Sequence, residues 1–304
     1  MLAPVVLFVY NREEHTRQTL EALKRNKLAG QSKLFLFSDG AKTEKDELKV
    51  QRVRELLRTY KAGEDFETIE IEEAEKNQGL ASSVIAGVSK IISQYGKVIV
   101  LEDDIVTAPN FLAYMNQALD YYEKNPKIWS VSGYTLPLSN LKSYQEDAFL
   151  SYRASSWGWG TWKDRWEPID WGLPDYSRFR KDRSQVRRFC RGGRDLYSML
   201  ERQQKGELDS WAVRWCYWQS KCDMLTVYPR VSLVQNTGCD GSGTHEGNAE
   251  VFGGHLKGEA EKKFDFSGAR LEKKIVREFY ETYSATLWFR IKNKLRKMRR
   301  AKRA

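Results

Sequence analysis

Three consecutive acidic residues, Glu102, Asp103 and Asp104, follow a short apolar run in the stretch VIVLEDDIVTAPNF at positions 98–111. Carboxylates this close together repel one another unless a positive charge lies beside them. A hard divalent cation supplies such a charge, prefers oxygen ligands and can bridge to phosphate oxygens. The triplet therefore points to cation and phosphate chemistry, while a solvated turn or the cap of the next helix would use the same residue types.

The elements that precede the triplet alternate between strand and helix patterns. Runs of β-branched and alternating residues predict strands over 5–10, 33–40, 66–74 and 97–104. Apolar residues at helical spacing predict helices over 13–28, 45–60 and 80–95. This order argues for an α/β fold in which helices cover both faces of a mostly parallel sheet.

Polar residues follow each of the predicted strands. They stand at Asn11–Arg12, Ser38–Gly40, Asn77–Gly79 and Glu102–Asp104. In sheets of this kind, ligands bind at the carboxyl ends of the strands. We therefore expect these four polar segments to converge on one edge of the sheet.

The second half of the chain is rich in tryptophan, with nine of the ten Trp after position 150. Five of them fall in 155–172, which we expect to be loop-like. Their rings either stack on sugars in an acceptor cleft, with Trp157 and Trp159 as the best candidates, or pack in a core. A helix is predicted over 209–223 and a strand over 227–235, before a polar Gly-rich loop at 236–248.

The net charge of +10 is concentrated at the C-terminus. Residues 288–304 hold nine Lys or Arg and no acid, which leaves 42 basic against 41 acidic residues in the rest of the chain. The tail has apolar residues at helical spacing, a pattern typical of helices that lie on anionic membranes. Nucleic-acid binding and a solvated disordered tail are the alternatives. Since no nucleic-acid-binding module is recognisable, we expect a membrane partner and no nucleic acid.

Targeting signals and cysteine usage indicate the compartment. No run approaches the length of a transmembrane helix, and the N-terminus lacks the features of a signal peptide. The four cysteines form no CxxC pair, so free thiols in a reducing cytosol are expected. The expected location is cytoplasmic, peripheral at the inner face of the cell membrane.

Taken in order, these motifs resemble the GT-A class of nucleotide-sugar glycosyltransferases. Over about residues 4–250 the chain is most similar to the N-acetylglucosaminyltransferase I type and its bacterial relatives. The matching segments are Asn11–Arg12, Asp39 beside Gly40, the Gln78–Gly79 pair, EDDIVTAPNF at 102–111, IWSVSGY at 128–134 and YRASSWGWGTW at 152–162.

The resemblance implies roles for individual residues. Arg12 and Asp39 would lie near the nucleotide base, and Glu102 and Asp103 would contact ribose or donor sugar. Gln78 would open a helix at the nucleotide-sugar site, and Asp104 would hold Mn²⁺ or Mg²⁺ against the diphosphate. From the residues alone, Arg12 is equally a solvated charge at a helix start, and Asp39 an ordinary turn residue.

Transfer of a sugar to an acceptor hydroxyl needs a base, which a carboxylate supplies. In the resembled family the base is an Asp just before a Trp at a helix start. The corresponding residue in GELDSWAVRW is Asp209, which would make the reaction inverting; the alternative is that Asp209 or Ser210 caps that helix. His245 in the Gly-rich loop would contact diphosphate or metal, or else belong to a plain surface loop.

The predicted organisation is a nucleotide-sugar-binding subdomain at 1–110, an acceptor-binding and catalytic subdomain of the same GT-A domain at 111–265, and a basic amphipathic tail at 266–304. The predicted function is a metal-dependent inverting glycosyltransferase. It would move a sugar from a UDP-sugar to a glycan or lipid-linked acceptor in surface polysaccharide synthesis. One alternative, a nucleotidyltransferase, would show a Gly-rich phosphate loop near the first strand. The other, a non-catalytic membrane- or carbohydrate-binding module, leaves the strand-end carboxylates unexplained.

Overall fold

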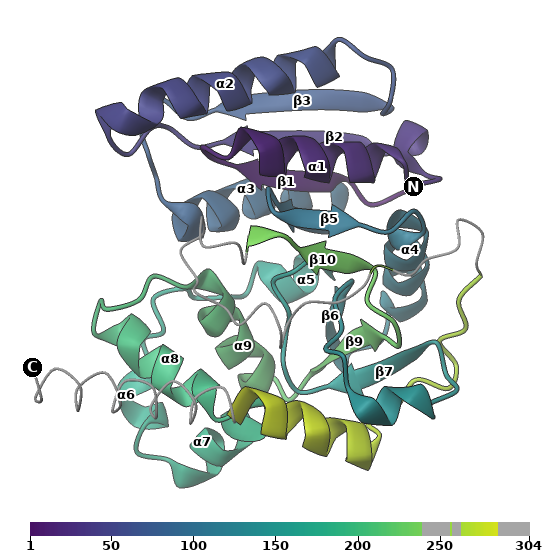
Figure 1. The fold of residues 1–304 in the computed structure, drawn as a ribbon. Coiled ribbons are helices and arrows are strands. Elements are labelled where there is room, and N and C mark those ends of the chain that lie inside the picture. The colour runs from purple at the N-terminus through teal and green to yellow at the C-terminus, as the bar shows by residue number, and fades with distance from the viewer. Residues whose placement is uncertain (239–255, 257–262, 285–304) are drawn as a thin grey trace, which may run out of the picture.

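The computed structural model describes residues 1–238, 256 and 263–284 (Figure 1). Its first half is a parallel sheet in which four strands stand in the order β3-β2-β1-β4. Their bounds are Val5–Val9 for β1, Lys33–Ser38 for β2, Thr68–Glu73 for β3 and Lys97–Glu102 for β4. The predicted α/β class is confirmed, and each of the first four predicted strands is present.

Four further strands continue the same sheet, so that eight strands of the described chain form one layer in the order β3-β2-β1-β4-β8-β6-β9-β7. β8 is antiparallel to both β4 and β6, β9 is parallel to β6, and β7 is antiparallel to β9. They span Ile128–Ser132 for β6, Ala148–Ser151 for β7, Trp159–Trp162 for β8 and Leu225–Pro229 for β9. The sheet therefore runs without a break across the subdomain boundary predicted at 110.

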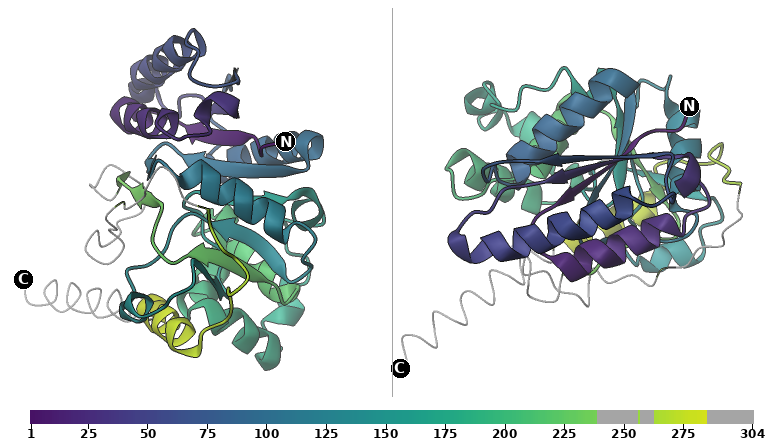
Figure 2. Two further views of the ribbon diagram at one scale, coloured as in Figure 1. Left: turned by 90° about the vertical axis from the view of Figure 1, so that its right-hand side faces the viewer. Right: turned by 90° about the horizontal axis from the view of Figure 1, so that it is seen from above.

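Helices cover both faces of the sheet (Figure 2). On one face lie α1 and α2, and on the other lies α3. Strand β1 is buried on both sides: Val5 and Leu7 face the α1 and α2 side, whereas Val6 and Phe8 face α3. A parallel strand buried on both faces reads as a continuous apolar run, which is why VVLFV does not alternate. The helices span Glu13–Lys24, Glu44–Lys61 and Leu80–Tyr95.

The second half adds helices to each of these two cores. α4 (Phe111–Tyr122) packs on the α1 side, and the tryptophan-rich core on the α3 side is enclosed by the helices that follow β8. These are α5 at Lys163–Trp166, α6 at Tyr176–Phe179, α7 at Arg183–Phe189, α8 at Asp195–Gln204 and α9 at Trp211–Lys221. Short 3₁₀ turns occur at Ala29–Gln31, Ser139–Lys142 and Cys190–Gly192.

The start of the predicted tail belongs to the folded body. Residues 273–284 are helical, and Phe266, Ile275 and Phe279 are buried in the core on the α1 side. The boundary drawn at 266 is therefore wrong for 266–284, because these apolar side chains cover the sheet. Residues 285–304, which hold the basic amphipathic pattern, lie outside the described residues.

Two other predictions are corrected by the sheet. The segment 155–172 is not loop-like, because β8 occupies the middle of the sheet, where Gly160 allows close packing: a Cβ there would lie 2.9 Å from the Val98 carbonyl oxygen. The single strand predicted over 227–235 is two strands, β9 and β10 (Val234–Asn236), which lie in different sheets. β10 pairs in antiparallel fashion with β5 (Ile105–Thr107).

None of the helices in the described ranges is long and apolar enough to span a bilayer.

Candidate active site at the carboxyl edge of the sheet

The acidic triplet lies where the strand order of the sheet reverses. After β1 the chain adds β2 and then β3 on one side, and it returns to place β4 on the other side of β1. Loops at such a switch point leave β1 and β4 in opposite directions, which opens a crevice at their carboxyl ends. Arg12 follows β1 and Asp103 follows β4, so both residues stand at this crevice.

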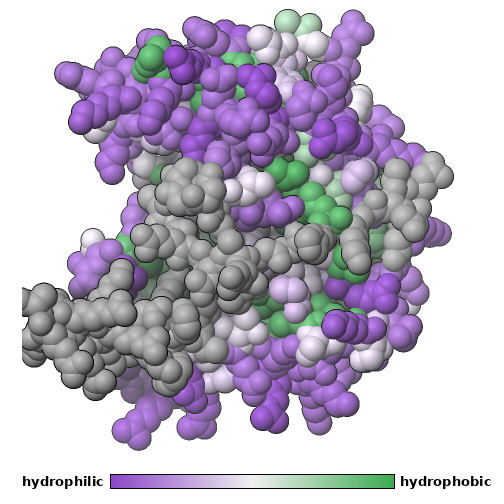
Figure 3. All heavy atoms as spheres, viewed as in Figure 1, coloured by the Kyte–Doolittle hydropathy of each residue, from purple (hydrophilic) through white to green (hydrophobic). Residues whose placement is uncertain are grey.

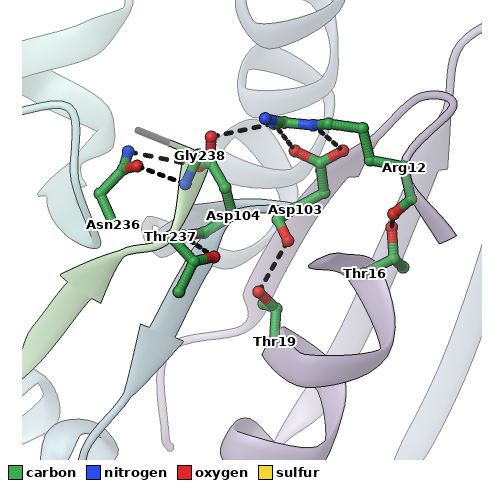
Figure 4. Close-up of polar contacts among 8 residues, drawn as sticks. All are labelled: Arg12, Thr16, Thr19, Asp103, Asp104, Asn236, Thr237 and Gly238. Atoms are coloured by element: carbon green, nitrogen blue, oxygen red, sulfur yellow. Dashed lines mark hydrogen bonds and ion pairs between the residues drawn. The ribbon is translucent and has the colours of Figure 1, made fainter. Parts of the chain in front are cut away.

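The guanidinium of Arg12 bridges two neighbouring carboxylates of the triplet (Figure 4). Its Nε donates to Asp103 Oδ2 at 3.2 Å, and its Nη2 donates both to Asp103 Oδ1 and to Asp104 Oδ2, the latter at 2.9 Å. These side chains are only 19%, 6% and 12% exposed. The third nitrogen, Nη1, is buried and has no hydrogen-bond partner within the described residues. The positive charge that the triplet requires is thus supplied in part by the protein itself.

Glu102 differs from the other two residues of the triplet because it forms no ion pair with Arg12. Its carboxylate makes no hydrogen bond or ion pair within the described part of the chain. Burial, with added repulsion from Asp104 and Asp103, raises the pKa of Glu102 to about 8. Burial also raises the pKa of Asp103, although its contact with Arg12 opposes this shift. The triplet thus has three consecutive carboxyl groups and one bridging guanidinium, so a further cation nearby would favour the ionised form of Glu102.

The backbone of the triplet is fixed by residues distant in sequence. Thr19 on α1 donates its hydroxyl to the carbonyl of Asp103 at 2.8 Å. The backbone N–H of Thr237, just after β10, donates to the carbonyl of Asp104 at 2.8 Å. A Cβ at Gly238 would lie 2.2 Å from Asp104 Oδ2, so any larger residue would force the chain at 238 or the Asp104 carboxylate to shift. The start of the Gly-rich loop therefore closes against the triplet.

Sequence reasoning missed these supporting residues. The signal that could have found them was the Asn-Thr-Gly run directly after a strand, because a glycine that follows a strand end often marks a close backbone approach. Asn236 accepts a hydrogen bond from the N–H of Gly238 at 2.8 Å, and its side-chain nitrogen lies 3.5 Å from Asp104 Oδ1. His245, the residue selected in this loop, lies outside the described residues.

Asp39 at the end of β2 organises a second cluster. Its Oδ1 accepts from the backbone N–H groups of Gly40 and Gln78, both at 2.8 Å. Its Oδ2 accepts from the N–H of Gly79 and the side chain of Asn77, both at 3.0 Å. The Asp39 carboxylate thus accepts four hydrogen bonds, and these fix the turn that precedes α3. The predicted convergence of the second and third polar segments is thus observed, and Gln78 is left with its side chain exposed.

Asn11 and Arg12 are adjacent but serve different sides of β1. Asn11 donates its side-chain amide to Asp46 Oδ1 on α2 at 2.9 Å, while Arg12 reaches across to the end of β4. Arg12 is therefore more than a solvated charge at a helix start.

The candidate base stands on the N-terminal side of α9. Asp209 is 65% exposed and lies 3.2 Å from Arg214. Ser210 caps the helix, because its hydroxyl accepts the N–H of Val213 at 3.3 Å. Ser210, and not Asp209, is therefore the residue that caps α9.

The two tryptophans proposed for the acceptor differ in exposure. Trp159 is 1% exposed and stacks on Trp211 and Trp166 in the core on the α3 side. As an acceptor-stacking residue it is a wrong prediction, since its faces are covered by other rings. Trp157 is partly buried and meets Tyr134 edge to face at 4.5 Å between ring centroids.

The oxygen ligands in the crevice suit a divalent cation, but the described side chains do not enclose one on all sides. The described residues contain no group of three or more His, Cys, Asp or Glu side chains arranged to hold a metal. Carboxylate oxygens are nevertheless the ligands that Mg²⁺ and Mn²⁺ prefer, and Mg²⁺ is commonly held by one or two carboxylates with waters and substrate phosphates. Asp104 and the uncompensated Glu102 are the residues that would attract it.

The sequence matches the model of one protein family. Residues 1–175 match the model of the GNT-I family. No curated protein matches the sequence significantly. Similar solved structures include S. aureus TarS at 13% identity, covering 40% of this chain and 20% of that one with a TM-score of 0.33.

Two further similar structures are of a shorter TarS chain, residues 1–349. One is 13% identical, covers 53% of this chain and 47% of that one, and has a TM-score of 0.39. The other, in complex with UDP-GlcNAc, is 14% identical, covers 52% and 45%, and has a TM-score of 0.37. The alignments thus span between a fifth and about half of those chains.

Proposed function

The chain belongs to the GNT-I family, and from this we propose that it is a glycosyltransferase that uses a nucleotide-sugar donor. The donor would bind in the crevice at the carboxyl ends of β1 and β4. The observation that carries this proposal is the bridge from Arg12 to Asp103 and Asp104 at the switch point of the sheet. Nucleotide ligands of open α/β sheets bind in crevices at this position.

Metal dependence is part of the proposal. Asp104 would hold Mn²⁺ or Mg²⁺, which, when bound, offsets the charge of the departing nucleoside diphosphate. The positive charge of Arg12 offsets the repulsion between the buried carboxylates of Asp103 and Asp104. The Nη1 of Arg12 has no hydrogen-bond partner within the described residues, and such a donor suits a phosphate or ribose oxygen.

The remaining polar residues would position the donor rather than react. Glu102 and Asp103 would contact ribose or sugar hydroxyls, and Gln78 would face the donor from the turn that Asp39 fixes. Because all the hydrogen bonds of the Asp39 carboxylate are internal, we assign it a positioning role. His245 is proposed to reach the diphosphate or metal from the Gly-rich loop.

Asp209 is the proposed general base, which makes the transfer inverting. Its support is that Ser210 supplies the helix cap, so the exposed carboxylate next to it has no capping role. Its carboxylate forms an ion pair with Arg214 at 3.2 Å, which holds it at the start of α9. The acceptor is proposed to be a glycan or lipid-linked glycan of a surface polysaccharide, met at the cytoplasmic face of the membrane, with Trp157 offering the stacking surface.

The test is a thermal-shift panel of UDP-, GDP-, dTDP- and CMP-sugars with and without Mn²⁺, followed by detection of released nucleotide. Wild type is compared with Asp104→Asn and with the matched control Glu70→Gln, an exposed carboxylate on β3. We expect one nucleotide class, with UDP tested first, to stabilise wild type and the control only with Mn²⁺. Unchanged binding and turnover in Asp104→Asn would remove the metal and diphosphate role, and release of pyrophosphate would favour nucleotidyl transfer instead.

A further inference from the structure

A second basic region lies inside the folded body. Residues 176–194 contain eight Lys or Arg and a single acid, Asp182. The Asp182 carboxylate caps α7, since it accepts from the N–H groups of Ser184 at 2.8 Å and Gln185 at 3.2 Å. The hydroxyl of Ser184 also donates to Asp182 at 2.6 Å, and this bond together with those from the N–H groups lowers the pKa of Asp182 to about 2, so its charge is engaged at the helix start. The near-neutral total of the body therefore conceals one strongly positive segment.

Most of this positive charge faces solvent without a partner. Phe179 and Phe189 anchor the segment in the core on the α3 side, which turns the basic side chains outward. Six of them are exposed and form no ion pair with any residue of the described chain: Arg178, Arg180, Lys181, Arg183, Arg187 and Arg188. Charges left uncompensated in this way repel one another, so an anionic partner would stabilise the surface.

An open pocket of about 430 Å³ lies between α7 and the helix at 273–284. The described side chains around it include four cations and two tyrosines and no carboxylate: Arg187, Arg191, Lys273, Arg277, Tyr152 and Tyr280. Arg191 is already 2.5 Å from Asp223, and Arg277 is 2.9 Å from Glu281, whereas Arg187 and Lys273 form no ion pair with any described residue. Arginine guanidinium groups bind phosphate oxygens through paired hydrogen bonds. The pocket therefore suits a phosphate group with an apolar neighbour.

The helix at 273–284 contacts the basic segment directly. Arg194 donates through its Nε to the hydroxyl of Tyr280 at 2.6 Å, and its backbone N–H donates to the Ser284 hydroxyl at 3.4 Å. Ser284 is the last described residue, and the nine Lys and Arg of 288–304 follow four residues later. The described chain therefore ends beside the basic segment 176–194.

We propose that α6, α7 and the helix at 273–284 form a docking surface for an anionic phospholipid bilayer, with the pocket taking a lipid phosphate headgroup. All three elements lie at the lower end of the molecule in Figure 1, where the pocket joins α7 to the helix at 273–284, and α2 lies at the opposite end. Hydrophilic residues cover the lower rim in Figure 3. A flat membrane explains a broad basic face better than a single small anion does, because the unpaired side chains extend well beyond the pocket.

The test measures partition of the full chain into vesicles of phosphatidylcholine alone and of phosphatidylcholine with about a third phosphatidylglycerol. The variant is Arg183→Gln/Arg187→Gln/Arg188→Gln, and its matched control is Lys45→Gln/Lys49→Gln/Arg52→Gln on α2. Each basic residue near an anionic leaflet contributes about 5-fold in binding, so the α7 variant should lose on the order of 100-fold on anionic vesicles. The α2 control should stay within about 3-fold of wild type.

Equal losses in both triple variants, or no loss in the α7 variant, would overturn the proposal, as would tighter binding of the wild type to duplex DNA than to anionic vesicles. Binding of free inorganic phosphate with no vesicle binding would also overturn it and leave only an anion site. Since the substituted side chains are exposed, matching circular dichroism melts should show that both variants fold. Hydrogen exchange of the unmodified protein provides a second measurement: residues 176–194 should gain protection when anionic vesicles are added.

Discussion

Arg12 Nη2 lies 2.9 Å from Asp104 Oδ2, and this contact joins the loop after β1 to the turn after β4. The same guanidinium holds Asp103, so one cation permits two consecutive buried carboxylates. Removing one partner of such a group leaves the other charges buried and uncompensated, which costs more than the contact itself contributes.

Arg12→Met is therefore expected to lower the free energy of unfolding by about 2–4 kcal/mol. The same variant should bind Mn²⁺ more tightly in the absence of nucleotide, because two carboxylates lose their internal cation. Urea denaturation and Mn²⁺ titration check the two effects. The control is Arg17→Met, which removes a charge from the exposed face of the same helix. Weaker Mn²⁺ binding in Arg12→Met would show that these carboxylates do not attract the metal.

Glu102 predicts a pH dependence of stability. Burial raises its folded pKa to about 8, above its value in the unfolded chain, so its stabilising contribution is present at low pH and is lost as the pH rises through about 8. In chelator, wild type should lose on the order of 2–4 kcal/mol relative to Glu102→Gln between pH 5 and pH 8. Denaturation at both pH values measures this difference, and parallel curves for the two proteins would contradict it.

Gly238→Ala tests the closure of the Gly-rich loop on the triplet. The added methyl would meet Asp104 Oδ2 at 2.2 Å, so the chain at 238 must move away. We expect a donor KM raised about 10-fold or more with a change in unfolding free energy below about 1 kcal/mol, since the segment lies at the rim of the site. Gly30→Ala is the control, because nothing lies within 4 Å of its added Cβ. Equal kinetics in both variants would separate this loop from donor binding.

Trp157 and Trp159 should respond in opposite ways to truncation. Trp159→Ala removes a ring packed in the tryptophan core and should cost about 3–5 kcal/mol of stability. Trp157→Ala should cost much less and instead raise the acceptor KM. Denaturation of both variants, together with acceptor titration, distinguishes the two roles. A Trp157 variant with unchanged acceptor kinetics would restrict this side chain to packing against Tyr134.

The first half of the fold was predictable because its elements carry local signals. The apolar run of β1 and the helical spacing of α2 and α3 can be recognised without tertiary information, and strand-end polarity located the crevice. The second half was not predictable in this way. Trp159 looks like a ligand-stacking residue until β8 is known to lie between β4 and β6, and the run from Leu225 to Asn236 does not reveal that its two ends belong to different sheets. Both features depend on pairing between strands that are distant in the sequence.

The role of Asp39 shows the same limit at the site. Its position beside a glycine at a strand end identified it as a site residue, but whether it faces a ligand or the protein depends on a turn 38–40 residues later. The Asn77–Gly79 donors occupy its carboxylate, and only the folded chain shows this.

The place of β9 has a consequence for synthesis of the chain. β9 stands between β6 and β7 and pairs with both, yet it is made after them. While the ribosome extends the chain from β7 to Leu225, the edge of β6 that will pair with β9 is open. β7 also has no partner strand until β9 has been made. Asp104 likewise acquires its backbone partner at Thr237 only after β9 is complete. The sheet and the acidic site are therefore completed late in the synthesis of the chain. Chains released before Leu225 would carry an exposed strand edge open to aggregation.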